Sequence, residues 1–212
     1  MISKNPKSVE KLVELHKERK ALIQRRLGEF SQVTPDRYFY ELLYCMMTPQ
    51  SSAEHAERTV GALQEVRFES SDVDPEPILR RKEHYIRFHI TKAKHLMKAK
   101  EQFESVVKAV SNGSSAFELR EWLVSNVLGL GYKEATHFLR NIGKNGGLAI
   151  LDRHILRNLK RFGVLRSIPQ SLSRTKYFVI EKKFAAFAHR IGIPLDELDL
   201  LFWSMETGEI RK

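Results

Sequence analysis

Apolar residues recur along the chain with the three-to-four-residue spacing of amphipathic helices. In the stretch 8–30, Leu12, Ile23 and Phe30 alternate with Lys, Arg and Glu, which is typical of a helix with one buried face. A second long apolar stripe runs through 90–107. No stretch has the two-residue alternation of a half-buried strand. The pattern predicts an all-α fold class.

The remaining helices are expected between turn-forming residues. Five of them are expected at 36–47, 132–142, 153–162, 173–190 and 194–206. Two more are expected to start at about 51 and at about 115. The segment 70–77 contains two prolines and several acidic residues, so we expect a surface loop there.

Several residues have the positions of helix caps. Thr34-Pro35 is typical of an N-cap followed by a proline in the first helical position. Ser51 and Ser115 each stand three residues before a glutamate, which is the spacing of a capping box. Gly143 and Gly163 follow apolar helical stretches and are expected to end them.

The charge of the chain favours an acidic polymer as its partner. Its 212 residues contain 36 Lys plus Arg against 26 Asp plus Glu, a net charge of +10. Clustered positive charge attracts phosphate groups. No apolar run approaches the ~20 residues that span a bilayer, and the N-terminal residues lack a signal-peptide core. We therefore expect a nucleic-acid-binding protein of the cytoplasm with no membrane association.

Residues 127–135, Val-Leu-Gly-Leu-Gly-Tyr-Lys-Glu-Ala, connect two predicted helices. Gly129 and Gly131 let the backbone approach a flat or anionic group closely. The N–H groups that begin the following helix are suited to a phosphate. This pattern resembles the helix-hairpin-helix element, which grips a DNA backbone without reading its sequence.

Asp152 follows a short apolar run and precedes a predicted helix. One interpretation is an ordinary N-cap, which contributes about 1 kcal/mol to stability. The second interpretation is functional. Asp152 lies 19 residues after Lys133, with one helix and one loop between them, and this spacing is compatible with two side chains that meet at the mouth of a cleft.

Two blocks, 129–141 and 150–156, together resemble the type-2 8-oxoguanine DNA glycosylase/AP lyases of the helix-hairpin-helix (HhH-GPD) superfamily. Shorter similar pieces lie at 48–53, 168–177, 198–203 and 207–212. The resemblance implies a two-lobed helical fold with a cleft between the lobes. We expect a central lobe at 35–165, with the hairpin at about 116–142, and a second lobe made of 1–34 and 166–212.

The same resemblance implies the chemistry. Lys133 would be a nucleophile that attacks the sugar carbon C1′ and holds the sugar as a Schiff base. Asp152 would stabilise the positive charge that develops on the sugar and help to move protons. The implied function is a bifunctional enzyme of base-excision repair, which removes 8-oxoguanine and nicks the strand by β-elimination.

The resemblance also implies a pocket for the extruded base. Trp203 and Phe88 are candidate walls, although the sequence around 84–92 departs from the usual family pattern. The C-terminal residue, Lys212, is expected to reach the pocket, where its carboxylate accepts hydrogen bonds from ring N–H groups. A buried core tryptophan and a solvated chain end are the ordinary alternatives for these residues.

Other residues are expected to contact DNA. The family usually has Ala-Asn where this chain has Pro49-Gln50. Gln50 is still an amide that is suited to fill the gap left by the extruded base. Further expected DNA contacts are Gly129, Gly131, Arg153 and His154.

Two competing functions stay open at this point. One is a helix-hairpin-helix glycosylase for another damaged or mismatched base, and the other is a non-catalytic DNA-binding module in which Lys133 only contacts phosphate. The single cysteine, Cys45, excludes an iron–sulfur cluster with four cysteine ligands, and the histidines lack metal-ligand spacing. We expect no metal site and no required cofactor, with a monovalent cation at the hairpin as the one optional ion. The expected partner is double-stranded DNA containing 8-oxoguanine, bound by a monomer in the nucleoid of a prokaryote, most simply an archaeon.

Overall fold

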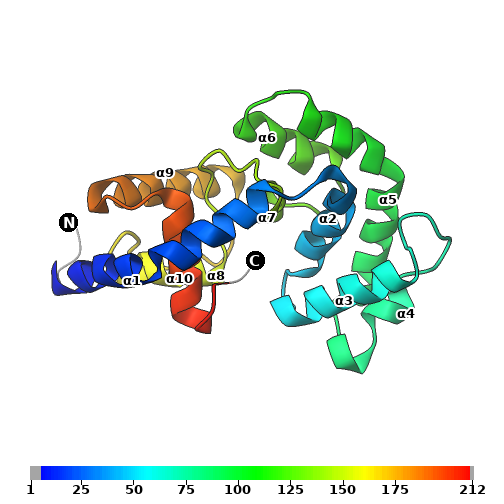
Figure 1. Ribbon diagram of the computed structural model, residues 1–212, viewed down its shortest axis with the longest axis horizontal. Coiled ribbons are helices and arrows are strands. Elements are labelled where there is room, and N and C mark those ends of the chain that lie inside the picture. The colour runs from blue at the N-terminus through cyan, green and yellow to red at the C-terminus, as the bar shows by residue number, and fades with distance from the viewer. Residues whose placement is uncertain (1–5, 211–212) are drawn as a thin grey trace. The chain divides into compact units, whose positions relative to one another are not determined.

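A computed structural model describes residues 6–210, and this part of the chain contains helices and connecting segments but no strand (Figure 1). The all-α prediction is therefore confirmed. The α-helices are α1 (Pro6–Ser31), α2 (Tyr38–Met47), α3 (Ala53–Glu65), α4 (Glu76–Leu79), α5 (His89–Ser111), α6 (Ala116–Asn126), α7 (Tyr132–Asn141), α8 (Arg153–Arg161), α9 (Arg174–Ile191) and α10 (Leu195–Thr207). Two short 3-10 helices are η1 (Pro35–Arg37) and η2 (Lys82–His84). None of the described helices is long and apolar enough to cross a membrane.

The chain divides into two compact units. The central unit is Val33–Lys144, and the terminal unit combines the residues up to Gln32 with those from Asn145 onward. The sequence-based division grouped 145–165 with the central lobe. In the structure this segment belongs to the terminal unit, because α8 packs against α10.

Helix α2 is the core of the central unit. Every residue of α2 except Tyr40 is buried, because α3, α5 and α7 all pack against it. Aromatic side chains fill the space between these helices. The Phe39 ring lies 5.0 Å from that of Phe103 and 6.1 Å from that of Phe68. The N-terminal end of α2 is thereby packed against α5 and against the residues that follow α3.

Helix α10 has the same role in the terminal unit, where it contacts α1, α8 and α9. The Phe202 ring stacks on Phe162 at 5.4 Å and on Phe184 at 5.6 Å between centroids. Burial of one such ring contributes about 2–3 kcal/mol. At the start of α10, the buried Glu197 carboxylate binds both His16 and Gln24 of α1, which ties the first helix of the chain to the last.

The helix ends partly follow the cap predictions. Ser115 forms the expected capping box with Glu118. The prediction for Ser51 is wrong, because Ser52 is the N-cap of α3 and accepts a hydrogen bond from the amide of His55. Thr34 makes no side-chain cap, and η1 precedes α2.

Two glycines end helices as expected. Gly143 and Gly163 have φ angles of 70° and 73° directly after the C-caps of α7 and α8. Such left-handed conformations favour glycine because it has no Cβ.

Candidate active site and DNA-contacting residues

The connection between α6 and α7 is a tight turn that only glycine fits. Gly129 has a φ of +88°, and a Cβ atom at this position would lie 2.3 Å from Nδ1 of His95. Val127 and Leu130 are buried while Leu128 is 57% exposed. The turn thus presents its tip to solvent and packs its base into the central unit.

Gly131 is constrained more weakly and for a different reason. Its φ of −93° is accessible to any residue. A Cβ at Gly131, however, would lie 2.9 Å from Oε2 of Glu134. That carboxylate accepts a hydrogen bond from the Gly131 amide at 3.2 Å, so Glu134 caps the N-terminus of α7.

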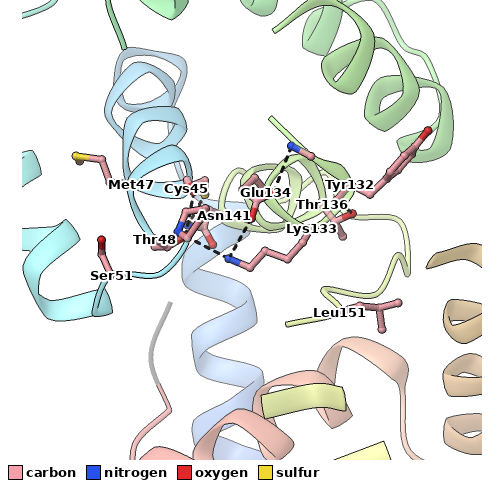
Figure 2. Close-up of polar contacts among 12 residues, drawn as sticks. Cys45, Met47, Thr48, Ser51, Tyr132, Lys133, Glu134, Thr136, Asn141 and Leu151 are labelled. Atoms are coloured by element: carbon pink, nitrogen blue, oxygen red, sulfur yellow. Dashed lines mark hydrogen bonds and ion pairs between the residues drawn. The ribbon is translucent and has the colours of Figure 1, made fainter. Parts of the chain in front are cut away.

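Lys133 lies in the first turn of α7, and its side chain points toward the end of α2 (Figure 2). Its ammonium donates a hydrogen bond to Oγ1 of Thr48 at 3.2 Å and lies 3.9 Å from Oε1 of Glu134. The side chain is 21% exposed. Thr48 Oγ1 in turn donates to the carbonyl of Cys45 at 2.9 Å. The Lys133 amine is therefore held in one place while remaining accessible.

A second lysine, Lys92, lies beside the same segment. It is 7% exposed, and its ammonium donates to the carbonyls of Met47 at 2.6 Å and Pro49 at 2.7 Å. Burial lowers the pKa of Lys92 to about 8, an effect that Glu134 opposes and the charge of Lys133 reinforces. The local sequence does not predict this buried position of Lys92, because it results from the packing of α5 on α2.

Two predicted site residues have strained backbone conformations. Gln50 has a φ of 56° and Phe88 a φ of 61°, a region that L-residues with large side chains rarely occupy. Both are exposed, Phe88 to 50%, and the Arg87 guanidinium lies 4.9 Å from the centroid of the Phe88 ring. Ser51 Oγ accepts a hydrogen bond from the Arg87 amide at 3.0 Å, so the segments that carry Gln50 and Phe88 are joined.

Asp152 belongs to the terminal unit, where it is the N-cap of α8. Its Oδ1 accepts a hydrogen bond from the Ile155 amide at 2.8 Å. The preceding loop is anchored to α9, because the Tyr177 hydroxyl donates to the carbonyl of Ala149 and accepts from the amide of Leu151. The half-buried carboxylate is therefore well fixed, and a helix N-terminus stabilises its negative charge.

Trp203 and His154 lie next to each other on α10 and α8. Their rings meet edge to face with centroids 6.3 Å apart, and both side chains are half-buried. Glu206 lies 3.8 Å from Nδ1 of His154. Arg153 is exposed on the first turn of α8. Lys212 lies outside the described residues.

Within residues 6–210 there is no group of three or more His, Cys, Asp or Glu side chains placed to hold a metal ion. The polar side chains that gather around Lys133 are instead hydroxyl and ammonium groups and the Glu134 carboxylate. This arrangement is suited to chemistry by an amine.

Comparison with known proteins identifies the family. The sequence profile of the family described as 8-oxoguanine DNA glycosylase (Ogg-HhH) matches residues 23–193. The 8-oxoguanine DNA glycosylase/AP lyase of Korarchaeum cryptofilum is 40% identical over 193 residues, which is 90% of each chain. That of Fusobacterium nucleatum is 35% identical over 93% of this chain and 94% of its own length.

Solved structures agree with the sequence relatives. The crystal structure of the 8-oxoguanine DNA glycosylase of Thermotoga maritima matches with a TM-score of 0.85 at 30% identity, over 96% of this chain and 98% of the other. The enzyme of Methanocaldococcus jannaschii in complex with a 15mer DNA containing 8-oxoguanine matches with a TM-score of 0.86 at 33% identity, over 96% and 99%. By sequence and by fold, the chain belongs to the 8-oxoguanine DNA glycosylase family.

Proposed function

We propose that the chain excises 8-oxoguanine from double-stranded DNA and then cleaves the strand, with Lys133 as the nucleophile. The observation that carries this proposal is the setting of the Lys133 amine. It follows the hairpin glycines, is mostly buried, and is held by the Thr48 hydroxyl. A lysine that only contacted phosphate would have no need of this partner.

The reaction follows from the chemistry of an amine. The neutral Lys133 amine attacks C1′, a bond forms between Nζ and C1′, and the bond from C1′ to the base breaks with the electron pair leaving on the base, which is protonated. Opening of the sugar ring then gives a Schiff base. This intermediate acidifies the C2′ proton, and its removal expels the 3′ phosphate, which nicks the strand. Water finally releases the lysine.

Asp152 is proposed to stabilise the positive charge that develops on the sugar. The hydrogen bond from the Ile155 amide to Oδ1 fixes the plane of the carboxyl group. Because this hydrogen bond involves only one of the two carboxylate oxygens, the same group is suited both to cap α8 and to face a cation.

The remaining predicted residues are proposed as DNA contacts. Trp203 and Phe88 are proposed as walls of the base pocket, with Lys212 at its edge, and Gln50 as the residue that fills the gap in the helix. The exposure of Phe88 and the strained backbones of Phe88 and Gln50 support this assignment, because such strain is found at functional sites. Gly129, Gly131, Arg153 and His154 are proposed to contact the phosphate backbone, and the protein to act as a monomer without a cofactor.

The test is a strand-cleavage and borohydride-trapping assay on a duplex that contains one 8-oxoguanine. The wild type should nick this duplex and form a trapped adduct, and Lys133→Gln should do neither. Lys182→Gln, which changes an exposed lysine of α9, is the matched control and should behave as the wild type. An undamaged duplex should give no adduct with any variant.

Two outcomes would count against the proposal. Equal trapping by the wild type and Lys133→Gln would exclude Lys133 as the nucleophile. Wild-type binding to the lesion duplex without a nick or an adduct would favour a binding module, and a panel of duplexes with other damaged bases would then test the related glycosylases.

A further inference from the structure

The segment 47–51 comprises the last residue of α2 and most of the connection to α3, and it carries two residues of the proposed site. Thr48 accepts the hydrogen bond from Lys133, and Gln50 has the left-handed backbone conformation. Between the two helices the segment has few backbone hydrogen bonds of its own; the amide of Ser51 donates to the carbonyl of Thr48. Other groups must therefore hold it in place.

The ammonium of Lys92 supplies that restraint. It reaches from α5 and donates to the Met47 and Pro49 carbonyls, which flank Thr48 in the chain, at 2.6 and 2.7 Å. It also lies 3.5 Å from Oγ of Ser51. A cation at the C-terminal end of a helix is well placed to bind carbonyls that have no partner within the helix. Lys92 thus holds both sides of the residue that receives Lys133.

We propose that Lys92 is a positioning residue for the Schiff-base step. It fixes segment 47–51 so that the Thr48 hydroxyl meets the amine of Lys133, and it does so without touching the substrate. This inference rests on the proposed function of Lys133. Loss of the Lys92 ammonium therefore displaces Thr48 and, with it, the attacking nitrogen of Lys133.

The environment of Lys92 argues against a role in packing alone. An ammonium group in a buried position is costly, and an apolar side chain fills such a space with less loss of solvation. The charge of Lys133 also repels this cation, although the Glu134 carboxylate offsets that repulsion. Because a buried ammonium at this position is costly, we infer that the protein needs the hydrogen bonds that Lys92 donates. All of them are directed at segment 47–51.

The experiment is a double-mutant cycle between Lys92→Met and Thr48→Val. Methionine keeps most of the length of lysine without its donors, and valine keeps the shape of threonine without its hydroxyl. Lys108→Met is the matched control, because Lys108 is an exposed lysine on the same helix, near its C-terminal end. For each variant we would measure the single-turnover excision rate with saturating enzyme, the affinity for the lesion duplex, and the melting temperature.

We expect Lys92→Met to lower the single-turnover rate by about 10–100-fold, the size of effect that follows from a small misplacement of a reacting group. The affinity for DNA should stay close to that of the wild type. The double variant should be as slow as the slower single variant to within about threefold, because both changes disrupt one arrangement. We expect the two substitutions to be coupled in their effect on the excision rate but not in their effect on the melting temperature. A purely structural lysine does not give this result.

The proposal is overturned if folded Lys92→Met excises at the wild-type rate, or if the two rate effects multiply. If Lys92→Met does not fold, Lys92→Arg takes its place. Arginine keeps the charge but moves the donors, so a folded Lys92→Arg with a reduced rate and unchanged affinity supports the proposal, and an unchanged rate contradicts it. Failure of the wild type to form any adduct at Lys133 would instead refute the proposed function itself.

Discussion

At the scale of single residues, the two lysines beside segment 47–51 show what sequence can reveal and what it cannot. Lys133 was predicted as the nucleophile because the hairpin segment that contains it resembles the glycosylase/AP lyase family, and that role stays a proposal. Its partner Thr48 and the buried Lys92 were not predicted as a group. Lys133, Thr48 and Lys92 come from three different helices or helix ends, and nothing in their local sequence encodes the packing that brings them together.

Lys92 should make the stability of the protein depend on pH. Its pKa in the folded state is about 8, below the usual 10.5, so above pH 8 the unfolded chain binds more protons at this site than the folded chain does. The free energy of unfolding should therefore rise with pH between about 8 and 10.5, by up to about 3 kcal/mol from this group. The measurement is urea denaturation of the wild type and Lys92→Met from pH 7 to pH 10. A difference between them that does not change with pH would contradict the prediction.

Asp152→Asn should separate capping from catalysis. Asparagine is as good an N-cap as aspartate, so the free energy of unfolding should change by less than about 0.5 kcal/mol. The excision rate should fall by about 10²–10⁴-fold, because the amide carries no charge to stabilise the sugar cation and accepts no proton. Ser173→Asn, at the N-cap of α9, is the control and should keep the wild-type rate. A fully active Asp152→Asn would show that Asp152 is only a cap.

At the scale of elements, the helices and their glycine ends were largely predictable because both depend on local sequence. The spacing of apolar residues gave the helices, and the capping box at Ser115 was read correctly. Ser51 was misread as a cap because Glu54 gives it, and not the adjacent Ser52, the spacing of a capping box. The choice depends on the amide of Arg87, which lies 36 residues away and binds Ser51 Oγ, and a tertiary contact of this kind leaves no local pattern.

Gly129 allows a test of how tightly the turn between α6 and α7 is constrained. Gly129→Ala forces a Cβ into the His95 ring in addition to a left-handed backbone, and should lower the free energy of unfolding by about 2–4 kcal/mol. Gly113→Ala is the matched control, since Gly113 has a φ of +80° with no atom within 4 Å of its Cβ position. It should lower the free energy by only about 1–2 kcal/mol. Chemical denaturation of both variants makes the comparison, and equal losses would show that the close approach to His95 does not constrain the turn.

At the scale of the whole molecule, the expected division of the chain differed from that of the structure at 145–165. The expected boundary at 165 falls between the predicted helices 153–162 and 173–190. In the structure α8 belongs to the terminal unit because it packs on α10, and its C-cap residue Phe162 stacks on Phe202. Lys133 and Asp152 consequently belong to different units, although they lie only 19 residues apart in the chain.

The net charge of +10 should make DNA binding strongly dependent on salt. The logarithm of the affinity should fall linearly with the logarithm of the salt concentration, with a slope of about −0.9 for each phosphate that the protein neutralises. Arg153→Ala should reduce this slope by about 0.9 if Arg153 contacts a phosphate, whereas Lys182→Ala should leave it unchanged. Fluorescence anisotropy of a labelled duplex at several salt concentrations gives the slopes. An identical slope for the wild type and Arg153→Ala would remove Arg153 from the DNA contacts.

The most direct test of the central claim is to locate the covalent bond. The wild type would be trapped with borohydride on a duplex containing 8-oxoguanine, digested, and examined by mass spectrometry for the lysine that carries the reduced sugar adduct. The account predicts that the adduct lies on Lys133 and that Lys92, which is buried and bound to two carbonyls, remains unmodified. An adduct on Lys92 or on any other lysine, with Lys133 unmodified, would contradict it.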